Sequence, residues 1–235
     1  MLGGGAMTQA ALAIYDMDKT VTRRATFTPF LLHAARRLAP WRLLLLPAVA
    51  ATGLGYALKL YDRARLKELN YRLLIGRVPP ERLEPVIQSF ADEQVRTNIL
   101  PGARARLAED KAAGRRLVMA TASYRLYAAA IAQRLGFDDV IGTGQAIDRK
   151  GRVLARIDGA NCYGAAKHDM ILAWLREQGL ERDAIHVRFY SDHVSDAVVH
   201  RWADEPVAAN PHRPLLDLAK AEGWEVAEWK EPRPR

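Results

Sequence analysis

Short apolar runs alternate along most of this chain with longer stretches in which apolar residues recur at helical spacing. Four runs have the length and composition of buried strands: 11–15, 116–120, 185–190 and 206–209. A glycine follows each of four expected helices: 103–113, 124–135, 165–178 and 214–222. Residues 138–158 predict short strands joined by a turn at 148–151. This strand–helix alternation predicts an α/β fold, with a parallel sheet covered by helices on both faces.

The stretch from 22 to 98 lacks this alternation and is nearly all helical. Its apolar positions recur at helical spacing in 26–39, 62–75 and 80–97, and Pro101-Gly102 is expected to be a break. An all-helical block after the first strand predicts an inserted helical cap. The expected organisation is an α/β core of 8–21 and 99–230, a cap of 22–98 and a disordered tail at 231–235.

Polar side chains gather where the expected strands end and one helix begins. Seven fall there: Asp16 and Asp18 after strand 11–15, Thr121 and Ser123 after strand 116–120, Asp192 and Asp196 after strand 185–190, and Lys167 at the start of helix 165–178. In open α/β sheets, ligands bind beyond the carboxyl ends of the strands. A single acidic pair is explained equally well by helix capping, which stabilises by about 1 kcal/mol. The ordered set of seven is what predicts a site.

These residue types suit phosphoryl transfer. A phosphate monoester carries nearly two negative charges, which repel an attacking carboxylate. Carboxylates that hold Mg²⁺ would cancel this charge, and a lysine and a hydroxyl can bind the phosphoryl oxygens. One carboxylate can then attack phosphorus and form an acyl phosphate. A second acid can protonate the leaving alcohol and later activate the water that hydrolyses the intermediate.

The motifs resemble those of the haloacid dehalogenase superfamily, in its phosphoserine-phosphatase-like subfamily IB with a helical cap. Residues 16–20 (Asp-Met-Asp-Lys-Thr) are similar to the first motif of that family, and Thr121, Lys167 and the segment 190–196 are similar to the other three. Lys19 stands where glycine is frequent in the family. The resemblance covers nearly the whole chain and implies a Rossmann-like core carrying a phosphatase site.

The resemblance also implies which residues react. Asp16 would be the nucleophile and Asp18 the general acid and base, while Thr121 and Lys167 would bind the phosphoryl group. A second register, in which Asp18 attacks as in P-type ion pumps, fits less well because Asp16 directly follows the strand and the chain is too short for a pump. A true dehalogenase is also disfavoured, since its chemistry does not need an acid at position 18.

The remaining acids are implied to hold and support a metal ion. Asp192 would bind Mg²⁺ together with Asp16 and the backbone carbonyl of Asp18. Asp196 would support the metal shell or Lys167, and Ser123 is a further supporting residue.

Charge and cysteine content narrow the class of protein. The chain has 35 Lys and Arg against 27 Asp and Glu, a net charge of +8, which suits an anionic partner. Its basic residues are spread out without interleaved aromatics, so no nucleic-acid partner is expected. The single cysteine, Cys162, excludes a disulfide framework within the chain and favours a reducing, cytoplasmic compartment. It is expected to be a small loop residue.

Residues 43–58 carry no charge and are the most unusual part of the expected cap. A sixteen-residue helix would span about 24 Å, short of the ~30 Å hydrocarbon core of a bilayer. Two interpretations stay open: a buried cap helix, or a segment lying in the membrane surface, which the basic flanks favour. This insert is similar to that of haloacid-dehalogenase-type phosphatidylglycerophosphatases.

The combined expectation is a Mg²⁺-dependent phosphatase that hydrolyses a phosphate monoester through an aspartyl-phosphate. The first expected substrate is a phospholipid head-group phosphate such as phosphatidylglycerophosphate, with the enzyme cytoplasmic or peripheral on the inner face of the membrane. Phosphoserine or another small phosphorylated metabolite is the alternative substrate. A non-catalytic protein that docks on membranes or partners through the cap is the alternative class. Oligomeric state and regulation are left open by the sequence.

Overall fold

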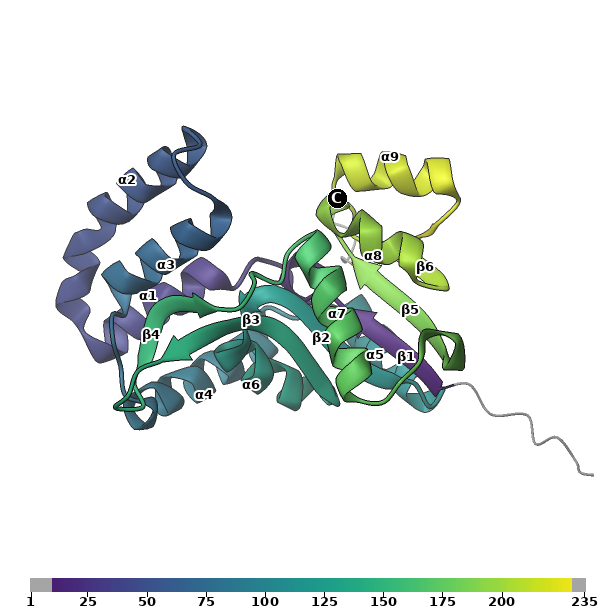
Figure 1. Cartoon of the computed structure of the whole chain (residues 1–235), viewed down its shortest axis with the longest axis horizontal. Helices are drawn as coiled ribbons and strands as arrows, with labels where there is room; N and C mark the ends of the chain where they lie inside the picture. The colour runs from purple at the N-terminus through teal and green to yellow at the C-terminus, as the bar shows by residue number, and fades with distance from the viewer. Residues whose placement is uncertain (1–9, 230–235) are drawn as a thin grey trace, which may run out of the picture.

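In the computed structural model, which describes residues 10–229, seven strands form one sheet in the order β4-β3-β2-β1-β5-β6-β7 (Figure 1). Neighbouring strands run parallel except β3 and β4, which are antiparallel. The strands are β1 (Ala10–Tyr15), β2 (Arg116–Tyr124), β3 (Asp139–Ile147), β4 (Val153–Asp158), β5 (Ile185–Ser191), β6 (Glu205–Ala209) and β7 (Glu225–Ala227). The predicted α/β fold is therefore confirmed. The expected tail at 231–235 lies outside the described residues.

The helices follow the predicted spacing closely. They are α1 (Phe27–Leu38), α2 (Leu46–Ala57), α3 (Arg63–Leu74), α4 (Pro80–Thr97), α5 (Pro101–Ala112), α6 (Arg125–Leu135), α7 (Ala165–Glu177), α8 (Ala197–Trp202) and α9 (Arg213–Glu222). Shorter helical turns occur at Met17–Val21, Pro40–Leu45, Arg182–Ala184 and Val194–Asp196. Helix α8 was not predicted, because six residues are too few to show a helical period in the sequence.

Alternate residues of the central strand β1 pack on opposite faces of the sheet. Ala13 and Tyr15 join a core cluster with residues of α5 and α6. Leu12 and Ile14 join a second cluster with residues of α7 and α8. Figure 1 shows these two pairs of helices on either side of the sheet. Leu12 and Ile14 each stabilise one face by about 1.5–3 kcal/mol, and Tyr15 is fully buried on the other. Because both faces are packed, the carboxyl end of β1 is held firmly.

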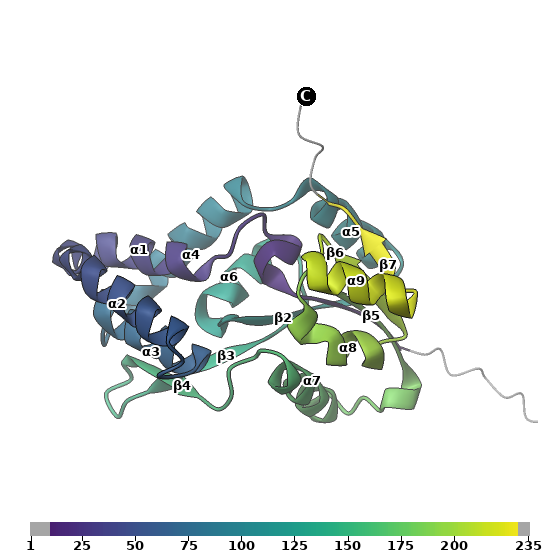
Figure 2. The ribbon, with the colours of Figure 1, turned by 90° about the horizontal axis from the view of Figure 1, so that it is seen from above.

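The helices α1 to α4 form an insert between β1 and α5, here called the helical insert. The two ends of the insert lie side by side, where the Arg23 amide donates to the Asn98 carbonyl at 2.6 Å. Helices α1 and α4 pack on α6 through aromatic contacts, with Phe30 stacked 4.4 Å from Tyr127 and Phe90 edge-on to both. Helices α2 and α3 lie farther out, at the end of the molecule remote from α9 (Figures 1 and 2).

Two predicted boundaries are wrong. Pro101-Gly102 is not a break but the first turn of α5, where proline costs nothing because its missing N–H has no helical partner. Strand β2 continues to Tyr124, so Thr121 and Ser123 lie in the last part of the strand and not after it. The extension keeps both hydroxyls at the carboxyl edge of the sheet.

The segment 43–58 is helical, but the interpretation as a buried cap helix is wrong. It forms the end of the 40–45 turn and the whole of α2, and Gly55 is its only buried residue. Leu44 is 81% exposed and Leu54 is 62% exposed. The helix rests mainly on α3, where Thr52 donates to Asn70 at 2.6 Å. Among the described residues, no helix has both the length and the apolar character needed to cross a bilayer.

Candidate active site

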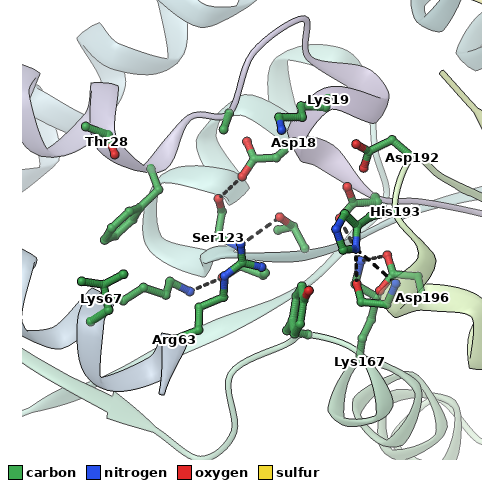
Figure 3. Close-up of a pocket in the computed structure, with 18 of the residues that line it drawn as sticks. Asp18, Lys19, Thr28, Arg63, Lys67, Ser123, Lys167, Asp192, His193 and Asp196 are labelled. Atoms are coloured by element: carbon green, nitrogen blue, oxygen red, sulfur yellow. Dashed lines mark hydrogen bonds and ion pairs between the residues drawn. The ribbon is translucent and has the colours of Figure 1, made fainter. Parts of the chain in front are cut away.

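A cleft of about 350 Å³ opens at the carboxyl edge of the sheet, between the core and the helical insert. Figure 3 shows its floor, where side chains from the turn after β1, from β2, from α7 and from the segment after β5 point toward one another. The structure brings together all seven predicted site residues as lining of this one cleft: Asp16, Asp18, Thr121, Ser123, Lys167, Asp192 and Asp196. Their convergence follows from topology, since β1, β2 and β5 are adjacent parallel strands.

Lys167 is the buried cation of the floor. Its Nζ donates to Asp16 Oδ1 at 2.8 Å and to Asp196 Oδ2 at 2.6 Å. Ser191 Oγ also donates to Asp196 Oδ2, at 2.7 Å. Burial alone would lower the pKa of Lys167, but the two adjacent carboxylates outweigh it and raise the pKa. The lysine is therefore charged, and Asp196 holds it against Asp16.

Asp16 and Asp192 are buried carboxylates with an excess of negative charge around them. Burial, together with Asp196 and Asp192, raises the pKa of Asp16 to about 7, although Lys167 acts in the opposite direction. Burial likewise raises the pKa of Asp192 to about 6, opposed by Lys19 and Lys167. Among residues 10–229, no side chain or backbone N–H donates to the Asp192 carboxylate or forms an ion pair with it. The charge balance of the site therefore favours binding of a further cation.

Asp18 has a different environment from Asp16. It is half-buried, and its Oδ1 accepts from both the backbone N–H and the hydroxyl of Thr26, each at 2.8 Å. Its Oδ2 accepts from Ser123 Oγ at 2.8 Å, and Tyr127 donates to that same Oγ at 2.7 Å. These contacts orient Asp18 toward the side of the cleft that faces the helical insert.

The turn at Met17–Val21, directly after Asp16, depends on an unusual backbone conformation. Lys19 has φ 66°, in the left-handed region that favours glycine. Asn210 supports the turn by donating to the Thr20 carbonyl at 3.3 Å. This conformation explains why glycine is frequent at this position of the motif. In this chain a lysine adopts it, which is less favourable than glycine because lysine has a Cβ atom.

Thr121 completes the inner part of the site, whereas Cys162 is buried nearby and does not line the cleft. Thr121 Oγ1 accepts from the Ser123 amide at 3.1 Å, which leaves its hydroxyl hydrogen to donate elsewhere. Cys162 is a free, buried thiol in the loop before α7, and burial raises its pKa to about 12. It therefore behaves as the small loop residue that the sequence predicts.

Sequence reasoning missed the residues that the helical insert contributes to the cleft. Thr26 binds Asp18 from the start of α1, and Arg63 and Lys67 of α3 line the wall of the cleft. Nothing in their local sequence distinguishes them, since each is a polar residue in or beside an ordinary amphipathic helix. Only tertiary packing brings them to the site: α3 lies over the end of β2, and the start of α1 lies beside Asp18.

Comparisons with known proteins agree with this geometry. The family model of haloacid dehalogenase-like hydrolases matches residues 13–199. The chain is 26% identical over 157 residues to a histidinol-phosphatase of Neisseria meningitidis serogroup C, covering 66% of this chain and 71% of that protein. It is 31% identical over 159 residues to the protein CicA of Caulobacter vibrioides, covering 66% and 68%.

Solved structures share the fold. A Bordetella pertussis protein of unknown function superposes with a TM-score of 0.83 at 25% identity, covering 94% of this chain and 99% of that one. A phosphoserine phosphatase structure described as a phospho-aspartyl intermediate analogue superposes with a TM-score of 0.62 at 16% identity, covering 95% of each chain. The family match spans most of the chain and includes all seven residues of the cleft floor. The chain therefore belongs to the haloacid dehalogenase-like hydrolase family.

Proposed function

We propose that this hydrolase is a Mg²⁺-dependent phosphatase that transfers the phosphoryl group of a phosphate monoester first to Asp16 and then to water. The observation that carries the proposal is the contrast between two carboxylates in one cleft. Asp16 is buried and bonded to the Lys167 ammonium, whereas Asp18 is held by hydroxyl and amide donors. Different surroundings of this kind separate the role of nucleophile from that of acid.

In the first step, a carboxylate oxygen of Asp16 forms a bond to phosphorus as the bond from phosphorus to the leaving oxygen breaks. Asp18 gives its proton to that leaving oxygen, and Lys167 and Thr121 donate to the phosphoryl oxygens. In the second step, Asp18 takes a proton from water, and this water attacks the aspartyl-phosphate. Inorganic phosphate leaves, and Asp16 and Asp18 return to their starting forms.

The donor set of the cleft is compatible with Mg²⁺. No three His, Cys, Asp or Glu side chains within residues 10–229 form a ready-made metal centre. Mg²⁺ often needs fewer, since it is commonly held by one or two carboxylates and keeps several waters. Asp16 and Asp192, with the backbone carbonyl of Asp18, would supply hard oxygen ligands. The bound ion would neutralise charge on the phosphoryl group and supply the positive charge that the two buried carboxylates lack.

The first candidate substrate is a phospholipid head-group phosphate such as phosphatidylglycerophosphate. Large apolar side chains are exposed around α2, among them Trp41, Leu44, Leu54 and Leu58, and this supports contact with a lipid surface. The basic flanks of the segment suit anionic lipid. Peripheral attachment to the inner face of the membrane is part of this proposal.

A small phosphorylated metabolite is the second candidate. It is favoured by relatives whose names state such activities, the Neisseria histidinol-phosphatase and a phosphoserine phosphatase of Mycobacterium tuberculosis, which is 28% identical over 144 residues and is matched over 46% of its length. A non-catalytic docking protein remains the other class of function, and the complete set of acids argues against it.

Phosphate release separates these candidates. The purified chain is assayed with Mg²⁺ on phosphatidylglycerophosphate in detergent, on phosphoserine and on an aryl phosphate. We expect release that EDTA abolishes and that the Asp16→Asn variant lacks. Absence of such release from all three would overturn the phosphatase proposal, and turnover of phosphoserine without the lipid would overturn the lipid substrate.

A further inference from the structure

The cleft continues beyond Asp18 to a region walled by the helical insert. In Figure 3, Arg63 and Lys67 lie on the side of Ser123 away from Asp192. Phe27 and Leu66 add apolar surface there, and Tyr163 contributes an aromatic ring. The proposed mechanism uses none of these side chains, although they line the same cleft.

Lys67 is a buried cation without a carboxylate partner. It is 6% exposed, and its Nζ donates to the Ala122 carbonyl and to Asn161 Oδ1, the latter at 2.8 Å. The Tyr124 ring, 5.0 Å away, is also neutral. Among the described residues, no carboxylate lies within ion-pair distance of this ammonium. Holding an unpaired charge out of water costs free energy, which a bound anion would offset.

The electrostatics around Lys67 agree with this reading of the contacts. Burial lowers its pKa to about 8, and the nearby Arg63 acts in the same direction. Asp18 opposes the shift, so its field reaches the ammonium, but it is too far away to form an ion pair. An anion bound beside Lys67 would favour the charged form of the lysine and so offset the effect of burial on its pKa.

Arg63 is the second cation of this region, at the exposed mouth of the cleft. Its guanidinium lies over the Tyr163 ring, 4.5 Å from the ring centre, and forms no ion pair with a described carboxylate. Arg65, two residues along the same helix, differs because it pairs with Glu68 at 3.0 Å. The ring positions the guanidinium of Arg63 while leaving its N–H groups to bind a ligand.

The order of groups along the cleft indicates which part of a substrate would meet these cations. The phosphoryl group must lie at Asp16, and the leaving oxygen must lie beside Asp18. Whatever the leaving alcohol carries then extends past Ser123 toward α3. Lys167 is already shared between Asp16 and Asp196. Lys19 lies at the Asp192 side of the cleft, so Lys67 and Arg63 are the cations on the α3 side that are left for that substituent (Figure 3).

We propose that Lys67 and Arg63 form a subsite for a second anionic group, carried by the leaving alcohol of the substrate. This inference rests on the proposed phosphatase function and narrows its substrate to a phosphate monoester with a further oxyanion. Two sources share that chemistry: the carboxylate of a small metabolite and the phosphodiester of a lipid head group. A substrate whose leaving alcohol is neutral lacks the contact.

The test measures KM and kcat for three substrates with Mg²⁺. Glycerol 3-phosphate has a neutral leaving alcohol, 3-phosphoglycerate adds a carboxylate, and phosphatidylglycerophosphate in detergent adds a phosphodiester. The variants are Arg63→Met and Lys67→Met, with Arg65→Met as the matched control on the same helix. Lys67→Arg tests for rescue by a retained charge, and Arg63→Met covers the case in which loss of the buried lysine impairs folding.

For the doubly anionic substrate that the enzyme prefers, we expect Arg63→Met to raise KM about tenfold and Lys67→Met to raise it further, with kcat little changed. KM for glycerol 3-phosphate should change by less than about twofold in both variants, and Arg65→Met should match the wild type. Preference for 3-phosphoglycerate assigns the subsite to a carboxylate, and preference for the lipid assigns it to a phosphodiester.

An equal rise in KM for all three substrates would overturn the subsite, because it would place these cations at the shared phosphoryl group. Unchanged KM values would overturn it as well. In both cases the phosphatase proposal stands. Absence of Mg²⁺-dependent turnover by the wild type on every substrate would overturn the proposed function itself, and the subsite with it.

Discussion

Strand β1 and helix α2 are both strongly apolar, yet they end in opposite environments. Leu12 and Ile14 of β1 are buried, whereas Leu54 of α2 and the adjacent Leu58 are exposed. The strand has a neighbour on each edge and helices over both faces, while α2 rests mainly on α3. An apolar sequence allows a segment to be buried, and the number of elements that pack on the segment decides how much of it is buried.

The largest expected effect concerns the carboxylate that follows β1. Asp16→Asn removes the nucleophile, so kcat for Mg²⁺-dependent phosphate release should fall at least about a thousandfold. The free energy of unfolding should change little, since Lys167 keeps its bond to Asp196. Asp217→Asn, at an exposed acid of α9 that pairs with Arg213, is the control and should retain activity. Comparable activity in both variants would show that Asp16 is not the nucleophile.

The next test breaks the comparison between β1 and α2 directly. Leu12→Ala opens a cavity between the sheet and α7 and should lower the free energy of unfolding by about 2–5 kcal/mol. Leu54→Ala removes an exposed side chain and should change it by less than about 0.5 kcal/mol. Urea titration measures both values. Similar losses in the two variants would mean that α2 is covered in solution.

A third test asks whether the exposed apolar side chains of α2 and of the turn before it bind a membrane. The double variant Leu44→Asp and Leu54→Asp should weaken sedimentation with anionic phospholipid vesicles at least about tenfold, because two apolar side chains no longer enter the lipid. Turnover of a water-soluble aryl phosphate should be unchanged. Ile147→Asp alters an exposed apolar residue of β3 and serves as the control. Equal vesicle binding by wild type and double variant would contradict a membrane role for α2.

The smallest expected effect is a dependence of stability on pH at the buried end of the core. His200 is buried against Trp224, with its ring nitrogens 3.2 Å from the Asp196 and Val207 carbonyls. Burial lowers its pKa below the usual 6.5. As pH falls through 6.5, the unfolded chain binds a proton before the folded one, so stability falls on acidification.

The stability lost in this way is at most about 1.4 kcal/mol per pH unit. His200→Gln should lose less stability than the wild type between pH 7.5 and 5.5, as measured by urea titration at both values. Because both proteins share every other titrating group, the difference between their two losses reports His200 alone. Equal losses would show that His200 does not contribute.

The residues on the floor of the cleft could be predicted because parallel strands bring their carboxyl ends to one edge. Asp16, Thr121 and Asp192 follow or end three strands that proved to be neighbours, so linear position was enough to place them together. Lys67 and Thr26 could not be predicted. Their contacts reach across to β2 and to Asp18 from helices of the insert, and helical periodicity says nothing about which helix lies over which strand.

The sequence by itself determined most of the elements, the α/β class and the seven side chains of the candidate site, because strand and helix periods, terminating glycines and residue chemistry are local properties. Tertiary structure decided the exposure of α2, the extension of β2 to Tyr124 and the placement of Arg63 and Lys67 in the cleft wall. Each of these depends on which segments lie side by side, and burial, pairing and charge compensation arise only when distant segments meet.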